Sequence, residues 1–240
     1  MNQPTAATGS PTEPVPSNAD RPAVAVDVVI FTLLDSDLKV LLVRRGSAPF
    51  KGVWAIPGGI IQAHESLEAA ALRKMEENAG AKDVFLEQLY TFGDLERDPR
   101  TRVISVTYFA LVRPDKLHPR PDPTTTEAAW HSVYGLPTLA FDHATILSYA
   151  LTRIRYKLEY SAVAFELMPE EFTLRELQEA YMIILNDHSL DKANFRKKLR
   201  YEPPIIEATG EVLRTKGRPA ALYRFREDAK REVKARRLFP

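Results

Sequence analysis

Two apolar runs lie near the start of the chain, AVAVDVVIFTLL at residues 23–34 and LKVLLVRR at residues 38–45. The polar stretch Asp35-Ser36-Asp37 separates them, so the pattern predicts a β-hairpin. VFLEQLYTFGD (84–94) and RVISVTYFALV (102–112) are also typical of strands. FDHATILSYALTRIRYKL (141–158) instead has apolar residues at helical spacing. Strands mixed with helices predict an α/β sandwich that ends near residue 157.

Residues 1–22 have a different composition. They contain five prolines, with serine, threonine and asparagine between them and almost no apolar side chains. Such a segment cannot bury enough apolar surface to offset the entropy lost on ordering. The sequence therefore predicts a disordered tail before the first strand.

Composition limits the classes of protein to consider. The chain has 240 residues, of which 45% are hydrophobic, enough for packed cores in one large or two smaller domains. It has no cysteine, which excludes disulfides and thiolate metal sites. No apolar run approaches the length of a membrane span, and the N-terminus lacks the pattern of a signal peptide. We therefore expect a soluble, cytoplasmic protein without membrane contact.

Charge is distributed unevenly along the chain. Residues 192–240 carry 15 Lys and Arg against 6 Asp and Glu, whereas residues 1–191 carry 18 against 26. An acidic body joined to a basic module favours nucleic acid as the partner of the basic part. The alternative is a charged tail that is simply solvated.

The stretch Gly59–Gly80, GIIQAHESLEAAALRKMEENAG, predicts a helix with defined ends. Ser66 is a suitable N-cap and Gly80 a suitable C′ residue, with strong helix formers between them. WAIPGG, directly before it, predicts a tight turn. An ordinary amphipathic helix would not require this glycine-bearing lead-in.

The spacing G-x5-E-x7-R-x-M-x-E-x-x-G in this stretch resembles the Nudix box. The matching residues are Gly59, Glu65, Arg73, Met75, Glu77 and Gly80. The resemblance implies a Nudix-like fold in which this loop and helix bind divalent metal against a diphosphate. It also implies that Arg73 pairs with Glu65 to hold the loop.

Two departures from the Nudix box concern the metal. Positions where the family has Glu are Lys74 and Asn78, so one face of the helix presents Lys, Glu77 and Asn instead of three carboxylates. Mg²⁺ requires oxygen ligands, and an ammonium three residues from Glu77 favours an ion pair in the place of the metal. Glu76 is about 100° around the helix and does not restore the site. We expect no catalytic residues, no bound Mg²⁺ and little or no hydrolase activity.

A phosphate-binding pocket can persist without its metal. Lys74 and the basic residues before the box could neutralise a diphosphate, and Phe50 and Trp54 could stack a base, although Trp54 could equally be a core residue. The candidate ligand-binding residues are Arg44, Arg45, Phe50, Lys51, Trp54, Lys74 and Glu77.

The last third of the chain predicts a winged helix. In EFTLRELQEAYMIIL, Thr173 and Glu176 form a capping box, Phe172 and Leu177 a hydrophobic staple, and an apolar helical stripe follows. NDHSL then breaks the helix, and DKANFRKKLRY predicts a second, basic helix. IIEATGEVL and ALYRF flank the basic turn TKGRPA, which suits a wing. The candidate DNA-binding residues are Thr173, Arg175, Lys192, Asn194, Arg196, Lys197, Lys198, Arg200, Lys216 and Arg218.

This order of motifs resembles the Nudix-related transcriptional regulators of NAD metabolism, NrtR. The resemblance covers nearly everything from residue 23 onward, including FGDLERDPRTRVISVTYFALV, LPTLAFDHATI, FTLRELQ, DKANFRKKL and GRPAALYRF. It implies an α+β chain: a disordered tail at 1–22, a Nudix-like α/β/α sandwich that binds the effector at 23–157 and a winged helix-turn-helix at 158–240.

The resemblance also implies a function. Such regulators are homodimers that sense ADP-ribose or a related NAD metabolite and bind palindromic double-stranded DNA operators. We therefore expect a regulator, in the first instance a repressor, of NAD biosynthesis or salvage genes that needs no cofactor. The alternative is an active Nudix hydrolase acting on ADP-ribose with an accessory basic domain. An RNA-binding module fits the charge but lacks the aromatic platform for stacking bases.

Overall fold

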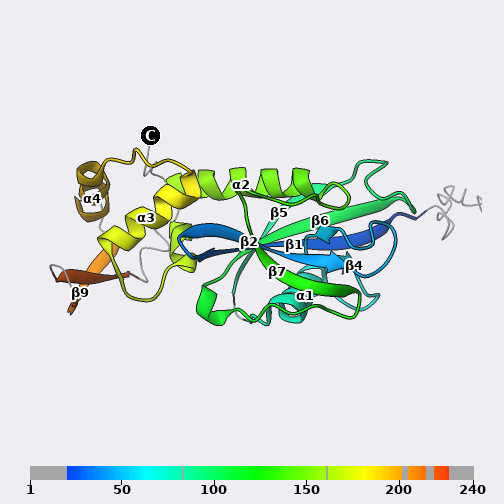
Figure 1. Ribbon diagram of the computed structural model, residues 1–240, viewed down its shortest axis with the longest axis horizontal. Coiled ribbons are helices and arrows are strands. Elements are labelled where there is room, and N and C mark those ends of the chain that lie inside the picture. Colours follow the sequence, from blue (N-terminus) through cyan, green and yellow to red (C-terminus); the bar gives the residue numbers. More distant parts are fainter. Residues whose placement is uncertain (1–20, 83, 161, 202–204, 215–218, 227–240) are drawn as a thin grey trace, which may run out of the picture.

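The computed structural model of the protein describes residues 21–226, apart from residues 83, 161, 202–204 and 215–218. Of the predicted disordered tail, only Arg21 and Pro22 are described. Lys216 and Arg218 of the predicted wing also lie outside the described residues. A large sheet with its helices makes up one portion of the molecule, and a smaller group of helices and strands lies at one end (Figure 1).

The large sheet is built on the predicted hairpin. Strands β1 (Ala23–Leu34) and β2 (Asp37–Arg45) pair antiparallel, and the turn between them places Asp35 and Ser36 at φ 54° and 56°. Two successive left-handed residues match the right-handed twist of the strands. The predicted strands at 84–94 and 102–112 are confirmed as β5 (Phe85–Phe92) and β6 (Val103–Leu111).

Three short or polar strands were not predicted. They are β3 (Trp54–Ala55), β4 (Gly58–Ile60) and β7 (Thr125–Ser132). Strands β3 and β7 pair with β2, and β4 pairs with β1. The order along the main path is β3-β2-β1-β6-β5, and only β1 and β6 run parallel. A 3-10 turn, η2 (Pro114–Lys116), follows β6.

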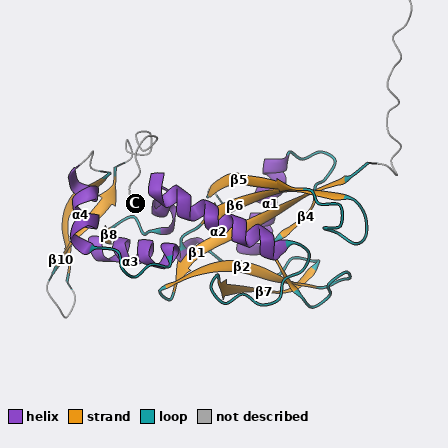
Figure 2. Cartoon of the chain, turned by 90° about the horizontal axis from the view of Figure 1, so that it is seen from above, coloured by secondary structure: helices purple, strands orange, loops and turns teal. Residues whose placement is uncertain are grey.

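Helices α1 (Leu67–Ala79) and α2 (His143–Tyr160) cover opposite faces of this sheet (Figures 1 and 2). Successive residues of a strand point to opposite faces, so neighbouring buried residues of β1 pack toward different helices. Ile30 of β1 lies in the cluster of Met75 of α1, whereas its neighbour Phe31 lies in the cluster of Ile146 of α2. The α/β/α sandwich is confirmed.

Both ends of α1 are those that the sequence predicts. The Ser66 hydroxyl accepts a hydrogen bond from the Ala69 backbone N–H at 3.1 Å. Gly80 has φ 66°, a left-handed conformation that favours glycine, and its N–H donates to the Glu76 carbonyl.

The smaller portion is a winged helix. It contains η3 (Ala162–Leu167), β8 (Phe172–Thr173), α3 (Leu174–Leu185), α4 (Lys192–Tyr201), β9 (Ile206–Leu213) and β10 (Ala220–Phe225). The three strands form a sheet in the order β8-β10-β9. The antiparallel pair β9 and β10 flanks residues 214–219 where the wing was predicted.

Local signals fix the two helices of this portion. The capping box of α3 is complete, with the Thr173 hydroxyl and the Glu176 carboxylate each accepting from the other's backbone N–H. Asn186, at φ 54°, ends α3. Phe195 and Leu199 of α4 are buried, as their spacing predicts.

One hydrophobic core continues from the large sheet into the winged helix. Ile154 and Leu158 of α2 belong to the same buried cluster as Phe172, Leu177 and Tyr181 of the smaller portion. Helix α2 runs through residue 157, the predicted end of the first domain, to Tyr160. The two portions therefore share packing as well as a covalent connection.

The hairpin turn yields a test of this fold. Ser36 carries a side chain in a left-handed conformation, which costs about 1 kcal/mol relative to glycine. We expect Ser36→Gly to raise the free energy of unfolding by about 0.5–1 kcal/mol, measured by urea denaturation. Ser47→Gly, in a loop where φ is not positive, is the control and should give no gain. Equal effects of the two changes would contradict this account of the turn.

Candidate functional site

The Pro-Gly-Gly turn before α1 has room only for glycine. A Cβ on Gly58 would lie 2.1 Å from Oδ1 of Asp27 and 2.6 Å from the Val26 carbonyl. A Cβ on Gly59 would lie 3.2 Å from Cε of Lys74. The turn therefore approaches both β1 and α1 closely, because neither glycine has a side chain.

Arg73 holds the following loop through Glu65. The guanidinium donates from Nε and Nη2 to the two Glu65 oxygens at 2.9 and 2.6 Å, and the Gln62 N–H donates to Oε1 of Glu65 at 2.7 Å. These bonds, chiefly that from Arg73, lower the pKa of the Glu65 carboxyl to about 2. The pairing implied by the Nudix resemblance is confirmed.

The ammonium of Lys74 lies between two carboxylates. Its Nζ is 2.7 Å from Oε2 of Glu77 and 3.0 Å from Oδ2 of Asp122. The predicted Lys74–Glu77 pair is confirmed, but sequence reasoning missed Asp122, which lies 48 residues away in a proline-rich loop. Lys74 and Asp122 are both buried, at 8% and 7% exposure. A buried ammonium without a carboxylate partner would be strongly destabilising, so the burial of Lys74 requires the charge of Asp122 beside it.

Asp122 is also bonded by its own loop. The backbone N–H and hydroxyl of Thr124 donate to Oδ1 of Asp122 at 2.8 and 2.7 Å, and the Thr125 hydroxyl lies 3.2 Å from the same atom. Burial opposes ionisation of this carboxyl, but the bonds from Thr124 and Lys74 outweigh it and lower the pKa of Asp122 to about 2. The carboxylate is therefore ionised at neutral pH.

The last turn of α1 holds no further carboxylate toward this site. Asn78 is fully buried, and its Nδ2 lies 3.5 Å from the Arg120 carbonyl while its Oδ1 has no hydrogen-bond partner. Glu76, which lies about 100° around the helix from Glu77, pairs with Lys82 instead. Arg120 donates to the carbonyls of Glu76 and Glu77 and so caps the helix.

The residues that could hold Mg²⁺ do not suit it. The face that carries carboxylates in the Nudix box has a lysine ammonium at its centre, already paired with both nearby carboxylates. Among the described residues, no group of three or more His, Cys, Asp or Glu is placed to bind a metal ion. The chemistry of this donor set fits a buried ion-pair network better than a hard cation.

The other predicted ligand residues fall into two groups. Arg44 lies 5.0 Å above the ring of half-buried Trp54, which contacts His131 of β7 edge to face. Arg45 and Phe50 instead meet at Phe141: the guanidinium lies 4.7 Å from the Phe141 ring and the Phe50 ring lies 4.9 Å away. Lys51 is exposed beside Phe50.

Arg100 extends the second group. Its guanidinium is 5.9 Å from the Phe141 ring and pairs with Asp98. Burial, followed by the charge of Arg100, lowers the pKa of Arg45. Two guanidinium groups therefore converge on one aromatic surface, and Phe50 is 41% exposed beside it. An anion next to an aromatic ring system would be favoured there.

A buried polar cluster connects the turn to α2. Asp27 accepts from the Ser105 hydroxyl at 2.5 Å and lies 3.5 Å from Arg97, which pairs with Asp142 at 2.7 Å. His143, the first residue of α2, accepts from the Ile56 N–H at 2.9 Å through Nδ1. Burial lowers the pKa of His143, which keeps the ring neutral and Nδ1 available as an acceptor.

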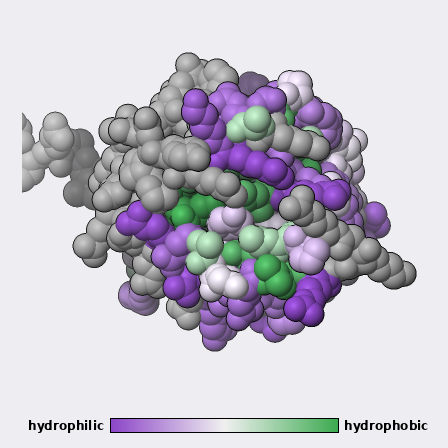
Figure 3. Space-filling model, turned by 90° about the vertical axis from the view of Figure 1, so that its left-hand side faces the viewer, coloured by the Kyte–Doolittle hydropathy of each residue, from purple (hydrophilic) through white to green (hydrophobic). Residues whose placement is uncertain are grey.

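The predicted DNA-binding residues lie at the opposite end of the molecule. Asn194, Arg196 and Lys197 of α4 and Arg175 of α3 are exposed, whereas Thr173 is buried in its capping box. Lys192, Lys198 and Arg200 lie in α4, but their side chains, like residues 216 and 218, are outside the description. The described surface at this end is mostly hydrophilic around a smaller apolar patch (Figure 3).

Comparisons with known proteins agree with both portions. The family model of the NUDIX domain matches residues 23–150, and that of the NrtR DNA-binding winged helix domain matches residues 164–225. The ADPR responsive transcriptional repressor NtrR of Acinetobacter baylyi is 37% identical over 213 residues, which cover 87% of this chain and 84% of that protein.

Two solved structures of Shewanella oneidensis NrtR are similar at 35% identity. One, complexed with a 27mer DNA, has a TM-score of 0.77 and covers 90% of this chain and 99% of the other. The other is its NUDIX domain complexed with ADP ribose, with a TM-score of 0.53, covering 59% of this chain and 94% of the other.

Fold and site together define a Nudix domain followed by a DNA-binding winged helix. No described helix is long and apolar enough to cross a membrane. The chain belongs to the NrtR family of Nudix-related transcriptional regulators.

The buried Asp122 carboxyl predicts a pH dependence. Its pKa is about 2 when folded against an ordinary value of 3.8. Because the folded value is lower, the stabilisation is fully present above pH 3.8 and disappears as the pH falls through about 2. We expect wild type to be more stable than Asp122→Asn at neutral pH and the difference to shrink steadily across this window, measured by urea denaturation at each pH.

Asp94→Asn, which removes an exposed carboxylate, controls for the change in net charge. A difference between wild type and Asp122→Asn that stays constant down to pH 2 would contradict the ion-pair assignment.

Proposed function

We propose that the protein is an ADP-ribose-responsive DNA-binding repressor of NAD biosynthesis or salvage genes. The observation that carries the proposal is Lys74, whose ammonium takes the place of a metal on the Nudix helix. Further support comes from the repressor of A. baylyi and from the S. oneidensis structures with DNA and with ADP ribose. A DNA-binding regulator acts where the chromosome lies, so we propose a cytoplasmic location.

We propose that the Nudix domain binds its effector without hydrolysing it. A sensor that destroys its ligand would report a falling signal. Since Glu77 and Asp122 already neutralise Lys74, the charge of a diphosphate would be met mainly by Arg45 and its neighbours, with Phe50 beside the base or sugar. The full candidate set is Arg44, Arg45, Phe50, Lys51, Trp54, Lys74 and Glu77.

This assignment of the Nudix helix predicts the hydrolytic behaviour. We expect negligible hydrolysis of ADP-ribose with Mg²⁺ by wild type, and measurable turnover after Lys74→Glu with Asn78→Glu, because three carboxylates of α1 would then face the site beside Asp122. Phosphate release after phosphatase treatment of the products is the measurement. Lys82→Glu, an exposed charge reversal, is the control and should remain inactive.

Robust hydrolysis by wild type, abolished by Glu77→Gln, would instead establish the alternative function, an active Nudix hydrolase.

We propose that the winged helix binds DNA as part of a homodimer. Two α4 helices would enter successive major grooves about one helical turn apart, with Asn194, Arg196 and Lys197 facing the DNA. Arg175 would contact phosphate, and Thr173 would order the N-terminus of α3 beside it. Lys192, Lys198, Arg200, Lys216 and Arg218 complete the candidate set. We propose that the boundary between the two domains lies near residue 157, a position that falls between the two family matches.

The position of α4 predicts a loss of DNA affinity on mutation. Arg196→Ala with Lys197→Ala should weaken binding at least about tenfold to the duplex that wild type selects from a randomised pool, and should reduce the salt dependence of binding. Fluorescence anisotropy at several salt concentrations is the measurement. Lys82→Ala with Lys116→Ala removes the same charge from the Nudix domain and should change little. Equal affinity of wild type and the α4 variant would mean that another surface binds DNA.

A further inference from the structure

Two side chains of the Nudix domain bind the C-terminal end of α3. Arg155 of α2 donates from Nε to the Ile184 carbonyl at 3.0 Å. The hydroxyl of Tyr134, from the loop after β7, donates to the Ile183 carbonyl and lies 3.2 Å from that of Ile184. Carbonyls in the last turn of a helix need partners beyond the regular helical bonds. The Ile183 carbonyl also accepts from the Asn186 N–H at 3.2 Å, so the two side chains add to the capping of this turn. We call this set of bonds the carbonyl latch.

Both elements that carry the latch begin at the Nudix site. Helix α2 begins at His143, which accepts from the Ile56 N–H in the turn before Gly58. Strand β7 begins at Thr125, whose hydroxyl bonds Asp122, the partner of Lys74. Two different paths therefore start at the Nudix site, one at the turn before α1 and one at the partner of Lys74, and both reach the Ile184 carbonyl.

Both elements are stiff enough to transmit a displacement. Residues 143 to 155 of α2 span about 18 Å of continuous helix. Residues 125 to 132 of β7 span about 23 Å and are hydrogen-bonded to β2 along that length. A shift imposed at the Nudix end would reach the latch, because neither a packed helix nor a paired strand can absorb it by bending locally.

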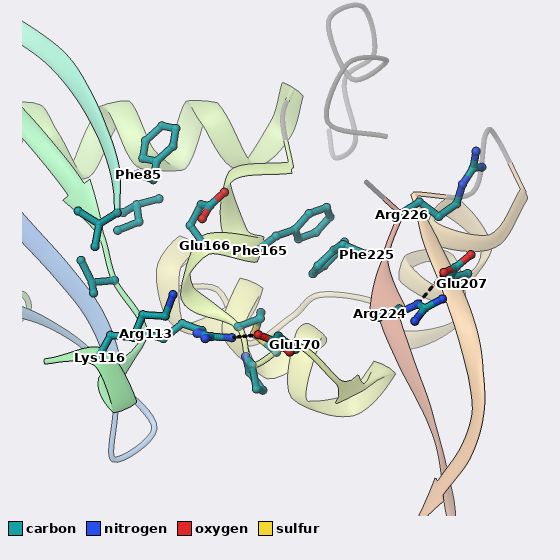
Figure 4. A pocket seen from close by; sticks show the side chains of 15 residues that line it. Phe85, Arg113, Lys116, Phe165, Glu166, Glu170, Glu207, Arg224, Phe225 and Arg226 are labelled. Carbon is teal, nitrogen blue, oxygen red and sulfur yellow. Dashed lines mark hydrogen bonds and ion pairs between the residues drawn. The ribbon is translucent and has the colours of Figure 1, made fainter. Parts of the chain in front are cut away.

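The junction leaves α3 room to move. A cavity of ≈960 Å³ lies between the domains, where Arg113 pairs with Glu170 and the Phe165 ring faces Phe225 (Figure 4). A second cavity, of ≈600 Å³, adjoins it and is lined by Ile183 and Ala180 of α3. Because Leu177, Tyr181 and Ile184 on the other side of α3 are fully buried in the shared core, the side that borders the second cavity is where α3 can shift.

Helix α4 follows the end of α3. The Gln178 amide of α3 donates to the Leu190 carbonyl at 3.1 Å, and Asp191 caps α4 by accepting from the Asn194 N–H at 2.7 Å. Phe195 of α4 packs against Tyr181 of α3 edge to face. The orientation of the basic helix is therefore set by where the end of α3 lies.

We propose that Tyr134 and Arg155 are the positioning residues that couple effector binding to DNA binding, with the carbonyl latch holding α3 in one of two positions. The proposal rests on the function proposed above. Occupancy of the Nudix site shifts the starts of α2 and β7, and the latch carries that shift to α4. Neither residue touches the effector or the DNA. The free-energy coupling between the two sites passes through them.

The test compares coupling factors. The DNA affinity of wild type and of Tyr134→Phe with Arg155→Met is measured with and without saturating ADP-ribose, on the duplex that wild type selects. ADP-ribose affinity of the free proteins is measured by calorimetry. We expect a coupling factor of about 5–150 in wild type. It should fall to within about twofold of 1 in the latch variant, while ADP-ribose affinity is unchanged.

The matched control is Tyr149→Phe with Arg153→Met. It makes the same two kinds of change at residues of α2 that contact Tyr90 and Leu89 of β5 and not α3. It should keep the wild-type coupling factor. Tyr134→Phe alone removes one hydroxyl and should lower the coupling factor partly. This single variant replaces the double variant in the test if the double variant is unstable.

The outcomes separate the two proposals. A merely structural role of the latch would weaken DNA binding equally with and without ADP-ribose and leave the factor unchanged, which would overturn the inference alone. A wild-type factor of 1 would overturn the proposed effector, and the latch with it.

Discussion

The buried charge of Lys74 governs how the Nudix portion is built. An ammonium that is almost fully removed from water needs carboxylates within contact distance, and Glu77 from the same helix supplies only one of them. The second, Asp122, fixes the loop after η2 against α1, and that loop also sets where β7 begins. One substitution on a helix thereby decides the position of a loop and a strand distant in sequence. A metal ion would have required a different arrangement of the same carboxylates.

The junction between the two domains combines tight and loose packing. Along α2 the core is continuous, since Ile154 and Leu158 pack with Leu177 and Tyr181 of the winged helix. On the other side of η3, two cavities of ≈960 and ≈600 Å³ separate the portions. A joint that is packed on one side and open on the other favours rotation about the packed side over separation. Such motion is what a sensor needs if a small ligand is to change the position of the DNA-reading helix.

The features that could be predicted from sequence are those that local chemistry determines. Ser66 and Gly80 end α1, the capping box begins α3, and Asp35 with Ser36 turns the hairpin, each through residues close in the chain. The spacing of the Nudix box also predicted the Glu65–Arg73 and Lys74–Glu77 pairs, because that motif is itself local in sequence.

The features that could not be predicted depend on long-range contacts. Strand β7, TTEAAWHS, has too little alternation of apolar and polar residues to predict a strand, and it exists because β2 offers it a partner. Asp122 and Tyr134 lie in loops, and nothing near them in the chain indicates Lys74 or the end of α3 as their partners. The candidate ligand residues also separate into two groups, because the adjacent residues Arg44 and Arg45 point to opposite faces of one strand. Arg44 lies over Trp54, whereas Arg45 lies over Phe141.

The core shared along α2 has a consequence for the fidelity of regulation. If the two domains unfolded independently, a molecule with a melted sensor and an intact winged helix would occupy DNA whatever the state of metabolism. Because Ile154 and Leu158 belong to both cores, loss of the sensor removes part of the packing that keeps the winged helix folded. Damaged molecules are then silenced as a whole, and a cell is spared repression that no signal can relieve.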